Sequence, residues 1–395
     1  MSSRRGFLQA TTSSLAVTGL SPLPRAAAAY TEGNRPTGLI DWHAHWIGPQ
    51  VVRLLKARAE PPRYEVNEKG EILAIQKGQS TSARPQSARW FDLEERIRQL
   101  DGSGVERQVL SWVGGSHDSD LSPDEARPLW IAQNDDLAAA VRKYPRRLSG
   151  LATLPTANLR WAAKELDRAH RELGLLGATL PLDAFVSLEG ARALAPIFQV
   201  AQRHRSHILV HRGLASPGIP GQQPEVGPAN AYVGLAGLSA PNERPRGIPG
   251  DHPIARATLL TSTHLATGVI TLALTDFLDA YPDVTVQVAM IGGSIPFVAE
   301  QIEFAEQAAG TPSAIQRLRR LYLDTGFSGR GPRGIALAAR VFGIDRILFG
   351  SDYGPQPAIA PYVDAVQRAE IRIADKRAIF AGNGRALLAG KQARL

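Results

Sequence analysis

The sequence predicts an α/β protein built as a closed (β/α)₈ barrel, and three observations support this prediction. Short apolar runs of strand length alternate with longer segments of helical periodicity, a pattern that indicates a parallel sheet. The alternation repeats eight times along the chain, as a (β/α)₈ barrel requires. No Gly-x-Gly-x-x-Gly motif follows the first strand, which argues against an open, doubly wound nucleotide-binding sheet.

The individual elements follow from apolar spacing, because strands are short apolar runs and helices repeat apolar residues every three or four positions. The first strand is expected at 38–46, and Val51–Glu60 after it has helical spacing. The other strands are expected at 108–112, 148–154, 178–180, 208–211, 284–289, 321–324 and 346–349. The other helices are expected at 92–100, 124–143, 159–173, 188–203, 264–280, 296–309, 334–342 and 363–388.

Two segments interrupt the regular alternation. Alternating runs on either side of Asn67–Gly70 predict a β-hairpin. We therefore expect residues 63–89 to form a small insertion after the first strand that covers the site as a lid. Residues 213–253, rich in glycine and proline, form a loop after the fifth strand that is too long for an ordinary connection, which is typical of a functional or covering loop.

The first 29 residues have the layout of an export signal. Arg4 and Arg5 precede an apolar run at 10–23, and small residues at 26–29 end it. The paired arginines followed by Phe-Leu resemble the twin-arginine type, which its own export machinery reads. We expect residues 1–29 to be removed and the barrel of residues 30–395 to be released into the periplasm or the extracellular space.

Composition excludes several classes of protein. The formal charge falls from +8 to +5 when a signal with three arginines and no acidic residue is removed, and the remaining basic residues are scattered, so we expect no nucleic-acid partner. No stretch reaches the roughly 18 apolar residues of a membrane span. The absence of cysteine excludes disulfides, thiolate metal ligands and cysteine nucleophiles.

Three histidines and one aspartate stand at the ends of predicted strands. His43 and His45 end the first strand and project to one face, because alternate side chains of a strand do so. His211 ends the fifth strand, and Asp352 follows the eighth. Since the carboxyl ends of barrel strands meet at one rim, we expect these side chains to bind one divalent metal ion, zinc or a similar ion, and a water whose pKa the ion lowers to about 7.

The residues around these positions resemble those of the amidohydrolase-related family, and most closely its branch named for aminocarboxymuconate-semialdehyde decarboxylase. The similarity is carried by Ile40–His45, Leu209–His211 and Arg346–Tyr353, and it extends over nearly all of residues 38–355. The resemblance implies a (β/α)₈ fold, one divalent metal on the four residues above, and decarboxylation, hydration or hydrolysis of small, often carboxylated molecules. Members often dimerise, which leaves a homodimer open.

One position departs from the family pattern. The family usually carries a histidine that acts as general acid/base at the end of the sixth strand, where this sequence has Met290. A thioether cannot transfer a proton, and positioned acid/base groups contribute about 10²–10⁴-fold. We expect the proton to be moved by Asp352, by His264 at the start of a predicted helix, by another loop histidine, or not at all.

Other residues are candidates for contact with the substrate or the ligands. The planar guanidinium of Arg212, directly after a ligand, suits a substrate carboxylate, with a structural ion pair as the alternative. Arg89 and Trp90 close the predicted insertion, and His117 follows the second strand. Asp324 ends the seventh strand and is expected to support the ligands. Three further histidines are expected on helix surfaces or in connectors, namely His170, His204 and His207.

Three hypotheses of function follow. The first is a metal-dependent hydrolase or carboxy-lyase that acts on a small, carboxylated molecule through a metal-bound water. The second is a metal-independent, lactonase-like hydrolase. The third is a catalytically inactive barrel that binds a ligand. Turnover that a chelator abolishes would support the first, turnover that survives chelation the second, and tight binding without turnover the third.

Overall fold

The computed structural model describes residues 36–75, 84–112, 121–221, 252–327 and 331–392. The predicted export signal and His117 lie outside the described residues. Among the helices described, none is long and apolar enough to cross a membrane.

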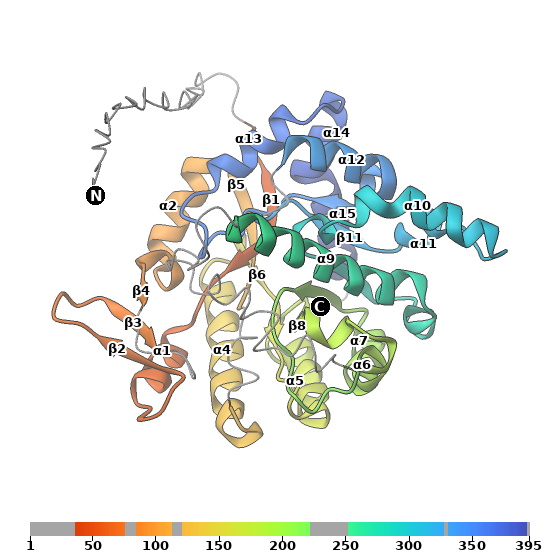
Figure 1. Ribbon diagram of the computed structural model, residues 1–395. Helices are drawn as coiled ribbons and strands as arrows, with labels where there is room; N and C mark the ends of the chain where they lie inside the picture. The colour runs from red at the N-terminus through yellow and green to blue at the C-terminus, as the bar shows by residue number, and fades with distance from the viewer. Residues whose placement is uncertain (1–35, 76–83, 113–120, 222–251, 328–330, 393–395) are drawn as a thin grey trace, which may run out of the picture. The chain divides into compact units, whose positions relative to one another are not determined.

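Parallel strands form the centre of the described chain, with the helices outside them (Figure 1). One sheet has the order β1-β5-β6, and a second has the order β12-β11-β10-β9-β8-β7. The strands are β1 (Leu39–His45), β5 (Val105–Ser111), β6 (Leu148–Gly150), β7 (Ala152–Thr153), β8 (Gly177–Pro181), β9 (His207–His211), β10 (Thr285–Val288), β11 (Tyr322–Asp324) and β12 (Ile347–Leu348).

Backbone hydrogen bonds close these strands into the predicted barrel. Only Leu151 separates β6 from β7, and its N–H donates to the carbonyl of Leu110 at 2.9 Å, so β6 and β7 act as one barrel strand. At the other seam, the N–H of Trp42 donates to the carbonyl of Phe349 at 2.8 Å. Every residue of β1, β8 and β9 is buried, as expected for parallel strands with both faces covered.

The helices follow the strands in nearly the predicted order. They are α1 (Pro49–Lys56), α2 (Leu93–Ser103), α4 (Pro123–Lys143), α5 (Leu159–Arg171), α6 (Leu188–Ala193), α7 (Ala195–His204), α9 (Pro253–Leu274), α10 (Ile295–Ala308), α11 (Ala314–Leu318), α12 (Pro332–Phe342), α13 (Ala360–Arg368), α14 (Ile373–Arg377) and α15 (Asn383–Gln392). The single helix expected at 363–388 is divided into α13, α14, a π-helical turn at Ala378–Gly382 and α15.

The predicted start of one helix was wrong. The helix expected to begin at His264 begins at Pro253, so α9 is 22 residues long and His264 lies in its middle. The run of threonine and serine before His264 is typical of a helix start, because these residues cap helices. Here the hydroxyl of Thr263 instead donates back to the carbonyl of Leu259 at 3.0 Å, a bond that is compatible with a continuous helix.

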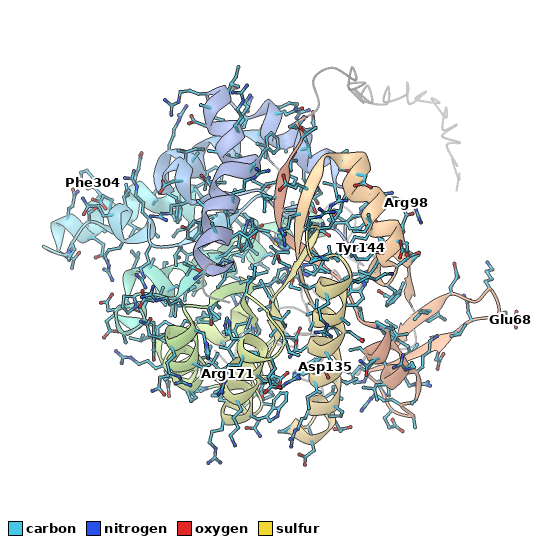
Figure 2. The ribbon with its side chains drawn as sticks, turned by 180° about the vertical axis from the view of Figure 1, so that it is seen from behind. Glu68, Arg98, Asp135, Tyr144, Arg171 and Phe304 are labelled. Carbon is cyan, nitrogen blue, oxygen red and sulfur yellow. The ribbon has the colours of Figure 1, made fainter. Side chains whose placement is uncertain are left out.

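The predicted hairpin is present as β2 (Arg63–Val66) and β3 (Ile72–Ile75), which pair antiparallel. The side-chain oxygen of Asn67 accepts from two backbone N–H groups of the turn, at 3.0 and 2.8 Å, which explains why the chain reverses there. A third strand, β4 (Arg84–Gln86), was not predicted. Figure 2 shows Glu68 at the tip of the hairpin, away from the barrel, so closure of a lid over the site stays a prediction.

Candidate metal centre

The four predicted donors lie together at the carboxyl ends of the barrel strands. Their ligand atoms are all within 4.8 Å of one another, and all four residues are buried. The Nε2 atoms of His43 and His45 are 3.1 Å apart. The Oδ1 atom of Asp352 is 3.0 Å from Nε2 of His45 and 3.4 Å from Nε2 of His43. The ring of His211 completes the group, 4.9 Å from the ring of His43 and 4.7 Å from that of His45.

The local backbone explains why Asp352 reaches this group. Its φ of 54° is in the left-handed region, which costs about 1–3 kcal/mol for a residue other than glycine. The N–H of Asp352 donates to the carbonyl of His43 at 2.7 Å, which holds this conformation. Two residues on, a Cβ at Gly354 would lie 2.6 Å from the carbonyl oxygen of His45, so a glycine is needed where the chain passes the first strand.

Each imidazole uses its Nδ1 on a neighbour, which leaves its Nε2 for the centre of the group. Nδ1 of His43 lies 2.8 Å from Oδ1 of Asp324, and Nδ1 of His211 donates to the carbonyl of Arg212 at 2.8 Å. Nδ1 of His45 lies 3.1 Å from the hydroxyl of Ser111, which itself donates to a backbone carbonyl. Partners of this kind fix the tautomer of metal-binding histidines.

The donor set fits a divalent metal ion. Nε2 of His211 is buried and has no hydrogen-bond partner in the described structure, a costly state that a bound cation would relieve. Three imidazole nitrogens and one carboxylate oxygen are donors that a divalent transition metal accepts. The structure thus brings together the residues predicted from the sequence, and they form a group that can hold one divalent ion.

Burial and neighbouring charges set the protonation of the group. Burial lowers the pKa of His45 and, with the nearby histidines, lowers that of His211 well below its usual value. Burial alone would raise the pKa of Asp352, but the hydrogen bonds from His43 and His45 outweigh it and hold the pKa well below its usual value. Two neutral imidazoles and an ionised carboxylate are therefore ready to bind a cation at neutral pH.

Asp324 supports the site in the way predicted from its place at the end of β11. Besides His43, its carboxylate accepts from Nε2 of Gln287 at 2.6 Å and from the backbone N–H of Gly326 at 2.8 Å. Burial raises its pKa, but the charge and hydrogen bond of His43 outweigh this effect, so the pKa lies below its usual value. An ionised Asp324 therefore fixes the ring of His43.

Met290 occupies the position where the family resemblance implies a histidine. It is buried and begins the turn Met290–Gly292 after β10, and the φ values of Met290 and Ile291 are 60° and 51°. Its backbone N–H donates to Oδ1 of Asp324 at 3.2 Å. The turn thus supports the ligand system through its backbone, while the side chain brings no ionisable group to the rim.

His264 is not at a helix start, contrary to the prediction, but its segment does approach the site rim. Nε2 of His264 lies 3.1 Å from Oδ1 of Asp183, which follows β8. The neighbouring carbonyl of Ser262 accepts from the N–H of Ser294 at 3.0 Å, so this part of α9 packs on the chain just after Met290. A role for His264 in proton transfer stays a prediction.

The predicted substrate-contact residues differ in where they lie. The indole of Trp90 is stacked near His45, with ring centroids 6.5 Å apart and an interplanar angle of 24°. Nε of Arg89 donates to the carbonyl of Gly354 at 2.7 Å, which ties this residue to the loop that follows Asp352. The backbone of Arg212 orients a ligand, as described above. Contact of any of these side chains with substrate stays a prediction.

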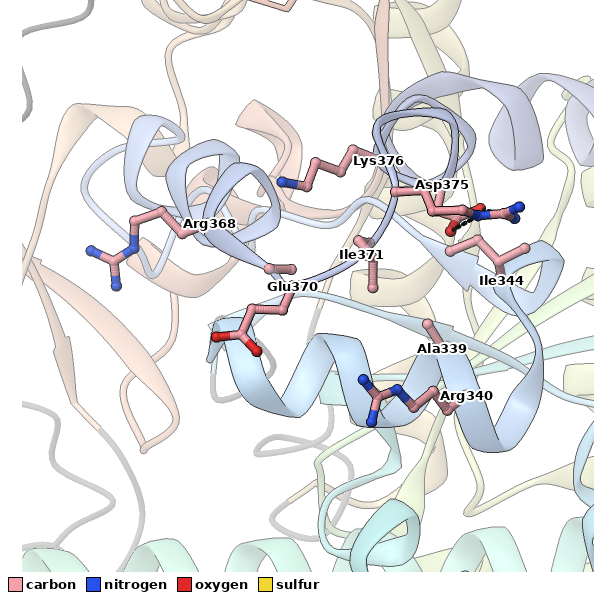
Figure 3. A pocket seen from close by; sticks show the side chains of 10 residues that line it. Ala339, Arg340, Ile344, Arg368, Glu370, Ile371, Asp375 and Lys376 are labelled. Carbon is pink, nitrogen blue, oxygen red and sulfur yellow. Dashed lines mark hydrogen bonds and ion pairs between the residues drawn. The ribbon is translucent and has the colours of Figure 1, made fainter.

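A hollow of about 890 Å³ lies elsewhere on the molecule and contains none of the four donors. Figure 3 shows it between the end of α12 and the chain that joins α13 to α14, with Arg340, Arg368 and Lys376 around it. Asp375 in its wall forms an ion pair with Arg372, whose Nη2 lies 2.8 Å from Oδ1 of Asp375. The hollow is therefore separate from the buried group of four donors at the strand ends. That group is the candidate site.

Sequence reasoning missed the buried polar residues behind the ligands. Arg96, Gln108, Asp41 and Ser351 are all wholly buried. Arg96 occurs four residues before the buried Leu100 in α2, and this position on the apolar face of a predicted helix was the available signal. An arginine on such a face indicates a buried partner, because an isolated buried charge is very unfavourable.

Comparison with known proteins agrees with the family resemblance seen in the sequence. A model of the amidohydrolase family matches residues 40–389. The gamma-resorcylate decarboxylase of Polaromonas sp. is 26% identical over 310 residues, which cover 76% of this chain and 88% of that protein. The gamma-resorcylate decarboxylase of Rhodococcus jostii is 24% identical over 279 residues, which cover 67% of this chain and 78% of that protein.

Solved structures share the fold. The 5-carboxyvanillate decarboxylase of Novosphingobium aromaticivorans, with bound manganese, gives a TM-score of 0.66 at 20% identity over 90% of this chain and 98% of its own. A dihydroxybenzoic acid decarboxylase of Polaromonas sp., with bound manganese and the inhibitor 2-nitroresorcinol, gives a TM-score of 0.63 at 19% identity. The match covers 91% of this chain and 98% of that chain. The predicted (β/α)₈ barrel is confirmed.

Proposed function

The chain belongs to the amidohydrolase family of enzymes, and from this premise we propose that it is a metal-dependent carboxy-lyase that removes CO₂ from a small aromatic carboxylic acid. The observation that carries the proposal is the buried group of His43, His45, His211 and Asp352, whose ligand atoms converge within 4.8 Å. Two relatives that cover two thirds or more of the chain are decarboxylases of an aromatic acid, which favours decarboxylation over hydrolysis.

Decarboxylation needs one bond to break and one proton to move, and residues of the site can assist both. The bond between the ring carbon and the carboxylate carbon breaks, CO₂ leaves, and the electron pair left on the ring carbon takes up a proton. A divalent ion, when bound, supplies positive charge for anionic oxygens of the substrate. Oδ1 of Asp352 faces His43 and His45. We assign to its Oδ2 the transfer of a proton from a substrate hydroxyl to the ring carbon, because Met290 supplies no acid.

We propose zinc as the ion. Three imidazoles and one carboxylate match the preferences of zinc better than those of manganese, which favours oxygen donors. Manganese is nevertheless the ion bound in two of the similar structures. Purification followed by elemental mass spectrometry, and reconstitution of the metal-free protein with each ion in turn, would decide between them through the rate that each restores.

A substrate panel tests the proposed reaction. The purified enzyme is incubated with 2,6-dihydroxybenzoate, 5-carboxyvanillate, a lactone and an aryl ester, and CO₂ release and acid release are measured with and without a chelator. We expect CO₂ from at least one aromatic acid, lost on chelation and in His211→Ala. Hydrolysis without CO₂ release would point to a hydrolase, dependent on metal or not. Tight binding of 2-nitroresorcinol with no turnover of any compound would point to an inactive barrel.

We also propose that the protein is exported by the twin-arginine route and acts outside the cytoplasm. The support is the order of paired arginines, apolar run and small residues in 1–29. Changing Arg4→Lys and Arg5→Lys together should leave the unprocessed chain in the cytoplasm, while the parent is processed and exported. Normal export of the double variant would contradict the proposal.

A further inference from the structure

A wholly buried arginine lies behind the metal ligands. The Nη1 group of Arg96, on α2, donates to Oε1 of Gln108 at 2.7 Å. Its Nη2 group donates to the backbone carbonyls of His45 at 2.6 Å and of Arg89 at 2.9 Å. Its guanidinium carbon is 4.9 Å from the centre of the Tyr353 ring. None of these contacts is a carboxylate, although buried charges are normally paired.

The matching negative charge is reached through Gln108. The Nε2 group of Gln108, on β5, donates to Oδ2 of Asp41 at 2.7 Å. The amide thus accepts from the cation and donates to the anion, which fixes its orientation. Arg96 and Asp41 are both wholly buried, so this single amide links two charges that water does not screen.

Asp41 holds the backbone beside two of the ligands. Its Oδ1 accepts from the N–H of His43 at 3.1 Å and from the N–H of Ser351 at 3.0 Å. Its Oδ2 also accepts from the hydroxyl of Ser351 at 2.6 Å. Ser351 directly precedes the ligand Asp352. Arg96 and Asp41 together therefore bind backbone groups of His43, His45 and Ser351, at or next to three of the four donors.

The same Nη2 group that donates to the carbonyl of His45 also holds the segment Ala88–Phe91, here called the wall segment, through the carbonyl of Arg89. The carbonyl of Trp90 accepts from the N–H of Ile47 at 2.9 Å, and the carbonyl of Phe91 accepts from the indole of Trp46 at 3.0 Å. The indole of Trp90 is stacked near His45. The wall segment is therefore joined to the chain that follows β1 and, through Arg96, to the ligands.

We propose that Arg96 is a positioning residue that, through Gln108 and Asp41, sets the metal ligands and the wall segment as one unit. The metal part of this proposal stands on geometry alone, and the substrate part rests on the proposed decarboxylase function. One guanidinium bridges the two regions, so its loss should loosen both together. Loss of a side chain that only fills space would not loosen the metal ligands and the wall segment specifically.

A double-mutant cycle tests the coupling. Zinc affinity is measured by competition with a chromophoric chelator for Arg96→Gln, Asp41→Asn and the double variant. We expect each single change to raise the apparent Kd for zinc by about 10-fold or more, as loss of supporting partners does. The double variant should then have an apparent Kd for zinc no higher than that of the single variant with the larger loss, because the two residues act through one chain of bonds. Effects that multiply would overturn the proposal.

Gln108→Leu and Arg107→Gln serve as the matched comparisons. Gln108→Leu breaks the link between Arg96 and Asp41, so the coupling between them should vanish. Arg107 also lies on β5 but donates to the carbonyls of Leu148 and Pro145 at the amino end of the barrel. Arg107→Gln should leave zinc affinity at the parent value. Equal losses in Arg96→Gln and Arg107→Gln would show general destabilisation and overturn the proposal.

The wall segment supplies a readout that needs no turnover. Amide hydrogen exchange of a peptide covering residues 88–91 should become at least about 10-fold faster in Arg96→Gln and stay unchanged in Arg107→Gln. Arg96→Lys keeps the charge and should restore part of the protection. With 2,6-dihydroxybenzoate, Arg96→Lys should raise KM more than it lowers kcat. Unchanged exchange in Arg96→Gln would contradict the coupling, whereas absence of turnover in the parent would contradict only the proposed function.

Discussion

Two histidine clusters lie at opposite ends of the barrel, and they differ in which ring nitrogens are occupied. At the carboxyl end, His43, His45 and His211 bind their neighbours through Nδ1 and direct Nε2 inward, as described above. At the amino end, the rings of His170 and His204 are stacked, 4.7 Å apart at an interplanar angle of 11°. There, each Nε2 is already occupied by a partner of its own.

The partners of the amino-end cluster explain why it is not a metal site. Nε2 of His204 lies 2.7 Å from Oδ1 of Asp167, and Nε2 of His170 lies 2.6 Å from the hydroxyl of Ser206. Both clusters contain histidines beside an aspartate, yet among the described residues only the carboxyl-end group has donor atoms that converge. The lesson is that ligand capacity depends on which nitrogen is left available, and not on residue type.

The largest expected effect comes from removing one histidine of each cluster in turn. His211→Ala should lower the rate of decarboxylation by more than about 100-fold, because a direct ligand matters more than the supporting partners, whose loss costs about 10–100-fold. His170→Ala should change the rate by less than about twofold. Steady-state kinetics of both purified variants checks this. Similar losses in both would mean that the two clusters do not differ in function.

The next effect comes from the aspartate of each cluster. Asp324→Asn should lower metal affinity by about 10–100-fold, because an amide can present an N–H to His43 and favour the wrong tautomer. Asp167→Asn, which alters the partner of His204, should leave metal affinity unchanged. Chelator competition measures both. Parent-like affinity in Asp324→Asn would mean that the tautomer of His43 is fixed in another way.

A smaller effect is expected from supplying the carboxyl end with a histidine that can titrate. Histidine tolerates the left-handed backbone found at position 290 better than most residues. Met290→His should therefore raise kcat by about 10-fold, which is below the range of about 10²–10⁴ for a well-positioned acid/base group. Met290→Gln, polar but unable to donate a proton in this way, is the control. No change in kcat or its pH profile would show that this position is not a proton shuttle.

The smallest effect concerns stability at the amino end. Burial first, and then the charges of His204 and Lys391, lower the pKa of His170 to about 4. The unfolded chain takes up this proton below about pH 6.5, whereas the folded chain does so only near pH 4, so stability falls as the pH drops through this window.

The pH dependence of unfolding measures this contribution. Between pH 6.5 and pH 5 the parent should lose about 1.5 kcal/mol more than His170→Gln, because the slope reaches roughly 1.4 kcal/mol for each pH unit only below pH 6.5, where the unfolded imidazole is half protonated. Urea unfolding curves at the two pH values give the difference. Identical losses in the parent and in His170→Gln would mean that His170 is not buried in its neutral form.

The sequence was informative about residues that stand at the carboxyl ends of the predicted strands. The histidines of β1 and β9 and the aspartate after β12 were predicted, because the carboxyl ends of parallel strands in a barrel share one rim. Asp324 was predicted as a supporting residue from its place at the end of the seventh strand and from the family resemblance. The strand alternation likewise predicted the barrel, although no strand pairing was visible in the sequence.

The sequence was uninformative where the outcome depends on packing. His207 was expected on a surface or in a connector, yet it is wholly buried on β9, with its ring nitrogens 3.0 Å from Thr285 and from Gln287. His170 and His204, expected on helix surfaces or in connectors, lie near the ends of α5 and α7 and share a cluster. Arg96 and Gln108 were missed because their partners lie far away in the sequence, and no local pattern shows which distant group a buried side chain will meet.

The most direct test is the metal content of three purified proteins, measured by elemental mass spectrometry. These are the parent, the carboxyl-end variant His43→Ala/His45→Ala and the amino-end variant His170→Ala/His204→Ala. We predict about one equivalent of divalent metal in the parent and in the amino-end variant, and almost none in the carboxyl-end variant. A parent that takes up no divalent metal even when it is supplied, or a carboxyl-end variant that keeps its metal, would contradict the account.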